Sequence, residues 1–170
     1  MIIRFSDQHG FDPVHVQRNL AKIINPPPER FMAAIVWYFQ LVPQYGLRWD
    51  FCLAQAALET SYSRSKVCVN SHNWAGIKIP SGQPSPGTYR VYPDDLEGIT
   101  DHIHHLARYT GLWVPDTIDP TRNTRIPAIL QQKLGVPYIS DSTQLNGIWA
   151  VPGTAYAQNI EKIRQRLFYG

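Results

Sequence analysis

The chain has 170 residues, of which 44% are apolar, and this size and composition suit one globular domain around a single core. Sixteen basic and thirteen acidic residues give a formal net charge of +3, which is too mild to indicate nucleic-acid binding and is compatible with approach to an anionic polymer. Residues 1–5 turn polar too early for a secretory signal and no apolar run is long enough for a membrane span, so we expect neither.

Three helices are predicted in the first part of the chain. Residues 12–24 carry an apolar stripe at helical spacing, and Asp12 can cap this helix at its N-terminus. Residues 29–42 and 49–60 are predicted as the second and third helices, with a run of three prolines before the second. The third is apolar over most of its length, and its alanines allow neighbouring helices to pack closely.

The second half is predicted to contain a hairpin and more helices. Apolar and aromatic residues flank a Pro-, Gly- and Ser-rich loop in 76–92, which indicates a short two-stranded hairpin. Further helices are predicted at 95–110, 126–134 and 154–167. The fold class is therefore mostly α (α+β). We expect residues 29–170 to form the main domain, and residues 1–28 to form either a partner-binding arm or part of the core.

The helix at 49–60 brings one carboxyl group, Glu59, to its C-terminal end. The sequence AQAALETSYS at residues 54–63 places an apolar helix behind this carboxyl, and NWAGIK follows at residues 73–78. Burial disfavours the charged form of a carboxyl group, so Glu59 is expected to hold its proton near neutral pH. A general acid for glycosidic bond cleavage needs this property.

Further landmarks follow in order along the chain. They are YRVY at residues 89–92, EGITDH at residues 97–102 and YA at residues 156–157. With these landmarks the chain resembles the N-acetylglucosaminidases of glycoside hydrolase family 73, which cut bacterial peptidoglycan, over about residues 31–170. The resemblance implies a lysozyme-like fold with a small β-hairpin lobe beside the active-site cleft, and no cofactor. It also implies endo-acting cleavage of the N-acetylglucosaminyl-β-1,4-N-acetylmuramic acid bond, with Glu59 as general acid.

A second catalytic carboxyl group is harder to place. Glycosidases usually use two, but residues 79–92 contain no acid. Asp94 and Asp95 either cap the following helix or supply the second carboxylate when substrate binds. Alternatively, the 2-acetamido group of the sugar acts as the nucleophile. Tyr156 matches the Tyr of the family's Tyr-Ala motif, where its phenol steadies the developing cation or orients the acetamido group; its other interpretation is a core residue.

Six residues are predicted to shape or line the substrate cleft. Trp74 offers a flat apolar face for a sugar ring, and Gly76 permits close approach of the backbone. The alternative for this loop is simple packing. The six residues are Tyr62, Asn73, Trp74, Gly76, Tyr89 and Tyr92.

Two other groups of side chains bear on cofactors and redox chemistry. The acid and histidines of one predicted helix resemble a metal cluster, but we expect solvated or capping roles for them and no metal. The two cysteines are either reduced buried thiols or a disulfide that pins the catalytic helix to the following loop. These residues are Asp101, His102, His104 and His105, and Cys52 and Cys68.

Two other functions compete with the glucosaminidase. One is a lytic transglycosylase or muramidase on the same fold, and the other is a non-catalytic wall-binding or virion component. The expected partner is the glycan strand of peptidoglycan, with no nucleic acid. Without a signal peptide, a wall hydrolase reaches its extracellular or periplasmic substrate by another route, as a phage endolysin or a virion-associated protein does. Residues 1–28 are then candidates for contact with a phage or secretion-apparatus partner.

Overall fold

The computed structural model describes residues 10–115 and 118–170, and the described part is mostly helical. The mostly-α prediction is confirmed. No helix in these ranges combines the length and apolar character needed to cross a membrane. The helices are α1 (Pro13–Ile23), α2 (Glu29–Leu41), α3 (Trp49–Thr60), α4 (Lys66–Ser71), α5 (Asp95–Tyr109), α6 (Arg122–Leu134) and α7 (Tyr156–Phe168), with short 3-10 helices η1 (Val42–Tyr45) and η2 (Ser142–Leu145).

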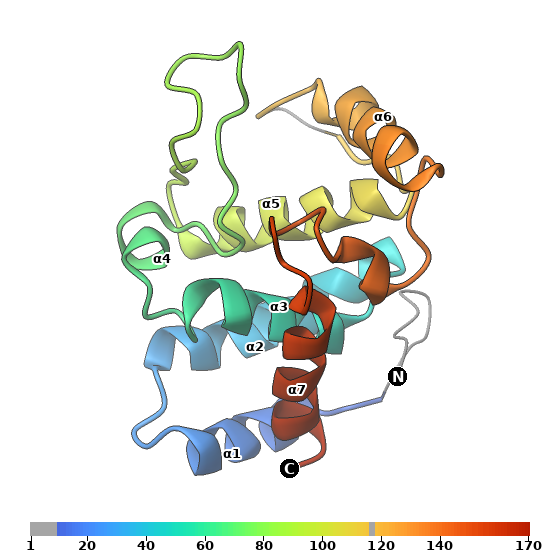
Figure 1. Cartoon of the computed structure of the whole chain (residues 1–170). Helices are drawn as coiled ribbons and strands as arrows, with labels where there is room; N and C mark the ends of the chain where they lie inside the picture. Colours follow the sequence, from blue (N-terminus) through green and yellow to red (C-terminus); the bar gives the residue numbers. More distant parts are fainter. Residues whose placement is uncertain (1–9, 116–117) are drawn as a thin grey trace.

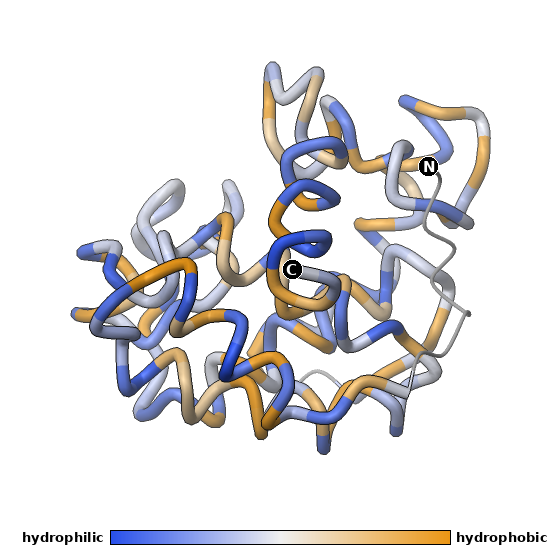
Figure 2. The backbone as a smooth tube through the Cα atoms, turned by 90° about the horizontal axis from the view of Figure 1, so that it is seen from below, coloured by the Kyte–Doolittle hydropathy of each residue, from blue (hydrophilic) through white to orange (hydrophobic). Residues whose placement is uncertain are grey.

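Helix α3 is the centre of the fold. Ten of its twelve residues are buried, and it packs against α2 and α7. Figure 1 shows α5 above this central layer and α1 below it. The surrounding helices are amphipathic, and Figure 2 shows hydrophilic and hydrophobic residues alternating along them as the helical period requires. The catalytic-helix prediction therefore corresponds to the most buried element described.

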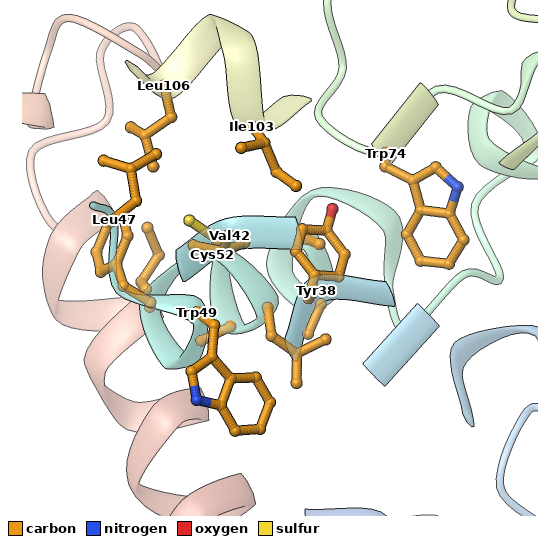
Figure 3. Close-up of a cluster of buried hydrophobic side chains, with 14 of the residues drawn as sticks. Tyr38, Val42, Leu47, Trp49, Cys52, Trp74, Ile103 and Leu106 are labelled. Atoms are coloured by element: carbon orange, nitrogen blue, oxygen red, sulfur yellow. The ribbon is translucent and has the colours of Figure 1, made fainter. Parts of the chain in front are cut away.

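The core lies between α2, α3, α5 and α7. Figure 3 shows Tyr38, Cys52 and Ile103 close together, with Trp49 and Trp74 at the edges of the cluster. Both cysteines are buried free thiols, so the reduced alternative holds and the disulfide is not formed. Burial raises the pKa of the Cys68 thiol to about 11, which keeps it protonated and unreactive.

Helix α1 packs against α2 and α7. Val16 and Leu20 are fully buried in the same core, and the Asn19 amide donates to the Leu167 carbonyl at 3.1 Å. Residues 1–9 of the predicted arm lie outside the described residues. The boundary at residue 28 and the arm's partner stay predictions.

The two-stranded hairpin predicted in residues 76–92 is not shown as a pair of regular strands. The segment folds back on itself as a long loop that projects from the helical body (Figure 1), but its ladder is a single antiparallel bridge between Lys78 and Tyr89. Backbone hydrogen bonds from the Ile79 N–H to the Thr88 carbonyl and from the Arg90 N–H to the Ile77 carbonyl extend this pairing slightly. Three prolines within the loop lack the N–H that a ladder needs, so the paired region stays short.

Helix boundaries differ from prediction at two places. Helix α6 begins at Arg122, four residues before the predicted start, because the buried Arg122 guanidinium is anchored to Asp101 of α5. Helix α7 begins at Tyr156 rather than after a cap at Thr154, because the Asn146 side chain accepts from the Ala157 N–H at 2.8 Å instead.

Candidate active site

The chain reverses direction immediately after Glu59. Helix α3 ends at Thr60, and the next three residues, 61–63, all have positive φ values between 50° and 64°. The buried Thr60 hydroxyl stabilises this turn, because it donates to the Ala56 carbonyl at 2.6 Å and accepts from the Ser63 N–H at 2.9 Å. Left-handed backbone is unfavourable for such residues, and its presence here holds Glu59 at a defined helix end.

The Glu59 carboxyl is half-buried between a donor and a glycine. The Tyr156 hydroxyl donates to Oε1 at 2.5 Å. On the other side, a Cβ at Gly76 would lie only 3.2 Å from Oε2, and Gly76 has a φ of 63°. A residue without a side chain is therefore needed where the loop passes the carboxyl.

The pKa of Glu59 is raised, which is the direction that the apolar helix predicts. Burial is the main cause, and hydrogen bonds from Tyr156 and Trp149 oppose it in part. Tyr156 itself stays protonated, because burial and the neighbouring Glu59 raise its pKa well above the ordinary value. The site thus holds a carboxyl whose pKa is raised by burial and a phenol that remains a donor.

An open hollow of about 390 Å³ lies beside this carboxyl. Gly76 and Trp149 both line it and both adjoin Glu59, which itself is not among the lining residues, so the hollow begins next to the acid. The Trp149 ring packs edge-on against His105 at 5.1 Å and lies 5.3 Å from the Tyr109 ring. The lining residues are Ala75, Gly76, Ile77, Lys78, His105, Tyr109, Trp149 and Val151.

Sequence reasoning missed Trp149, His105 and Tyr109 as lining residues. The available signal for Trp149 was a lone Trp within a Gly- and Pro-containing stretch of 147–153, where a loop aromatic is a candidate ligand contact. No such signal singled out the other two, which sit on a helix with ordinary apolar spacing.

The prediction that Trp74 stacks on a sugar is wrong. Trp74 is fully buried, and its indole N–H donates to Asp95 at 3.0 Å. Asn73 is also buried, because its amide donates to the carbonyls of Ile77 and Arg90 and accepts from the Ile77 N–H. These two residues fix the conformation of the loop that carries Gly76, so they support the site without lining it.

The three predicted cleft tyrosines have different surroundings. Tyr92 is buried and its hydroxyl donates to Asp101 at 2.5 Å, which ties its polar end to α5. Tyr89 is exposed, with the Lys78 ammonium 5.4 Å from its ring centre. Tyr62 is half-buried, edge-on to a core Phe. Substrate contact stays a prediction for Tyr62 and Tyr89.

Asp94 and Asp95 both anchor the N-terminus of α5. Asp94 is the N-cap and accepts from the Glu97 N–H at 2.9 Å. Burial acts to raise the pKa of Asp95, but hydrogen bonds from Arg30, His72 and Trp74 outweigh it and lower that pKa. Neither aspartate lines the hollow beside Glu59. These contacts favour the interpretation in which both aspartates cap or anchor α5 rather than supply a second catalytic carboxylate.

The expectation of solvated or capping roles for the acid and histidines of α5 is wrong for Asp101 and His102. Asp101 is buried and forms a bidentate ion pair with Arg122. His102 is fully buried, and His104 shares a hydrogen bond with Tyr45 at 2.7 Å. Within residues 10–115 and 118–170, no group of three or more His, Cys, Asp or Glu side chains has a geometry that could hold a metal ion.

Fold and site together define a helical protein with one half-buried carboxyl group of raised pKa beside an open hollow, which is the arrangement that general acid catalysis needs. The chain belongs to the Glucosaminidase family, described as mannosyl-glycoprotein endo-beta-N-acetylglucosaminidase, whose family model matches residues 37–167. This confirms the family resemblance, and the matched segment contains Glu59, Gly76 and Tyr156. No curated protein matches the chain.

Proposed function

We propose that this protein is an endo-acting peptidoglycan hydrolase that cleaves the N-acetylglucosaminyl-β-1,4-N-acetylmuramic acid bond, with Glu59 as general acid. The observation that carries the proposal is the Glu59 carboxyl, held between the Tyr156 hydroxyl and Gly76 at the edge of an open hollow. Family membership supports a glycoside hydrolase in general. Peptidoglycan as substrate, and this bond in particular, belong to the proposal.

In the first step Glu59 gives its proton to the glycosidic oxygen as the bond to the anomeric carbon breaks. The residues that line the hollow include no carboxylate. This supports substrate assistance, in which the acetamido oxygen of the sugar attacks the anomeric carbon. The Glu59 carboxylate then takes a proton from the water that opens this intermediate, which restores the acid form. The charge that develops at the sugar meets the aromatic faces of Trp149 and Tyr109.

The wider setting follows from the same proposal. A lysozyme-like arrangement places the projecting loop of 76–92 as one wall of the cleft, although it contains a single bridge rather than a β-hairpin. The protein then acts on the cell wall outside the cytoplasm, as an autolysin or endolysin does. Residues 1–28 remain the candidate region for contact with a phage or secretion-apparatus partner.

The test is to digest purified peptidoglycan with the wild-type protein and to identify the new chain ends by mass spectrometry. The proposal predicts reducing N-acetylglucosamine ends. Anhydro-muramic ends would indicate a lytic transglycosylase, and reducing N-acetylmuramic acid ends would indicate a muramidase. Glycan binding without any product, surviving in Glu59→Gln, would indicate a wall-binding or virion component.

A further inference from the structure

A continuous chain of buried hydrogen bonds runs from the core to Glu59, and the proposed chemistry does not account for it. Tyr38 of α2 bonds to His102 of α5 at 2.7 Å, and His102 bonds to Gln55 of α3 at 3.0 Å. Gln55 bonds to Tyr156 of α7 at 2.9 Å, which bonds to Glu59 at 2.5 Å. The first three residues are fully buried. Four helices thus meet in one polar path.

Donor and acceptor rules give this chain one direction when Glu59 is ionised. A carboxylate can only accept, so Tyr156 donates to Oε1 and has only lone pairs left for the Gln55 Nε2–H. Gln55 Oε1 therefore accepts from the His102 Nε2–H. Burial lowers the pKa of His102 to about 3, so the ring is neutral and accepts at Nδ1 from Tyr38. Every donor points toward the acid.

This direction decides which oxygen of Glu59 carries the catalytic proton. When the protonated acid keeps this direction, Oε1 still receives the Tyr156 proton and the acid proton lies on Oε2; the Trp149 indole N–H also donates to this carboxyl. Oε2 is the oxygen beside Gly76, on the wall of the hollow. If every hydrogen bond of this path ran in the opposite direction, Glu59 would carry its proton on Oε1. It would then donate that proton to the buried Tyr156 hydroxyl, away from a ligand.

We propose that Gln55 and His102 are positioning residues, which fix the Tyr156 hydroxyl as a donor to Oε1 and thereby keep the acid proton of Glu59 on Oε2, facing the substrate. This inference rests on the proposed function, because it concerns the proton that Glu59 delivers. It requires neutral histidines nearby, and burial lowers the pKa of His105 to about 3 as well. The titratable and charged groups around the carboxyl and the hollow are Tyr156 of α7, His102, His105 and Tyr109 of α5, and Lys78 of the projecting loop.

The direction of the chain can be measured in the wild-type protein. Nitrogen-15 NMR of the histidine side chains reports which ring nitrogen carries the proton. The proposal predicts that His102 is neutral and protonated at Nε2. A His102 ring protonated at Nδ1, or at both nitrogens, would overturn it without any variant.

Kinetics of three variants test the positioning role. Gln55→Leu cuts the chain next to Tyr156, and His102→Phe leaves the Gln55 amide free to flip and draw the Tyr156 proton away from Glu59. We expect kcat to fall by about 10- to 100-fold with KM unchanged, as for a misplaced catalytic group. The basic limb of the pH–rate profile should move to higher pH, because the Tyr156 hydroxyl is no longer fixed as a donor to the ionised form of Glu59. His102→Gln keeps a donor and should restore most of the activity.

A matched control comes from the same helix. His104 shares an equally short bond with a tyrosine, Tyr45, but lies outside the chain. His104→Phe should leave kcat and the basic limb unchanged. Folded Gln55→Leu and His102→Phe proteins with an unmoved limb would overturn the proposal, since a purely structural role lowers stability without moving it.

A direct titration separates this inference from the proposed function. Carbon-13 NMR of the Glu59 carboxyl gives its pKa whether or not the protein turns over peptidoglycan. Suppose that the wild type is inactive but the pKa of Glu59 is higher in Gln55→Leu than in wild type. The proposed hydrolase activity would then be rejected, while the effect of the hydrogen-bond path on the carboxyl would stand. An active wild type whose Glu59 titration is unchanged in Gln55→Leu would reject the positioning role alone.

Discussion

Replacing Gly76 by Ala perturbs the Glu59 carboxyl without removing any polar group. The new Cβ would lie 3.2 Å from Oε2, a distance at which one partner must move by a few tenths of an ångström. The backbone at Gly76 has a φ of 63°, so the loop cannot adapt freely to an alanine. The carboxyl is therefore the group that we expect to move.

The two consequences have different sizes. An alanine in left-handed backbone costs about 1–2 kcal/mol, which for a domain of this length lowers Tm by roughly 2–8 °C. Displacement of a catalytic group by about 1 Å can reduce the rate about 100-fold. A shift of a few tenths of an ångström should therefore reduce kcat by about 10-fold.

Gly46→Ala is the matched control. Gly46 has a φ of 62°, and a Cβ there would meet nothing within 4 Å. It should lose as much stability as Gly76→Ala in thermal unfolding followed by circular dichroism. However, it should keep full activity in a peptidoglycan assay that counts new reducing ends. Equal activity in the two variants would refute the assignment of Oε2 as the oxygen that serves the substrate.

Three further predictions concern Glu59, its donor and the core beneath. Tyr156→Phe leaves the buried Gln55 N–H without its acceptor, so urea unfolding should show a loss of about 1–3 kcal/mol; an unchanged free energy of unfolding would contradict the hydrogen bond. Glu59→Gln should stabilise the protein, relative to wild type, at pH values above the folded pKa of Glu59. Because burial raises the folded pKa of Glu59, the wild type loses stability as pH rises through that pKa, whereas the variant does not; unfolding curves on both sides of the folded pKa measure this, and a pH-independent difference would count against the raised pKa. Asp50→Ala leaves two buried arginines without their shared carboxylate and should cost about 3–5 kcal/mol, with kcat per folded molecule unchanged; a purely kinetic defect would be inconsistent with this role.

The helices and the acid were predictable from the sequence because their signals are local. Asp12 accepts from the Val14 N–H at the start of α1, and Asp94 caps α5, as short acidic side chains before apolar periodic segments indicate. The apolar run before Glu59 likewise predicts a buried helix and a carboxyl with a raised pKa. These inferences need only neighbours along the chain.

The errors concern contacts between segments distant in sequence. Trp74 is an aromatic residue in a polar loop, and the sequence does not show whether such a ring faces solvent or the core. Its burial depends on Asp95, which receives the indole N–H from another element. The projecting loop shows the same limit, because its alternating residues suit a strand while its prolines prevent a ladder.

Gln55 was a missed signal of a different kind. It is a polar residue within an apolar stretch of the chain, and it lies four residues before Glu59 on the same face. A buried polar group needs partners, so this spacing already pointed to a polar contact beside the acid. The identity of those partners, Tyr156 and His102, depends on helices that the sequence places far away.

The central claim is that Glu59 is the acid of a peptidoglycan hydrolase, and the most direct measurement compares wild type, Glu59→Gln and Glu97→Gln on purified peptidoglycan. Glu97 is an exposed glutamate in the first turn of α5, so its substitution makes the same chemical change away from the hollow beside Glu59. The account predicts that wild type and Glu97→Gln release reducing N-acetylglucosamine ends at equal rates, while folded Glu59→Gln releases none. Product formation by Glu59→Gln at the wild-type rate would contradict it.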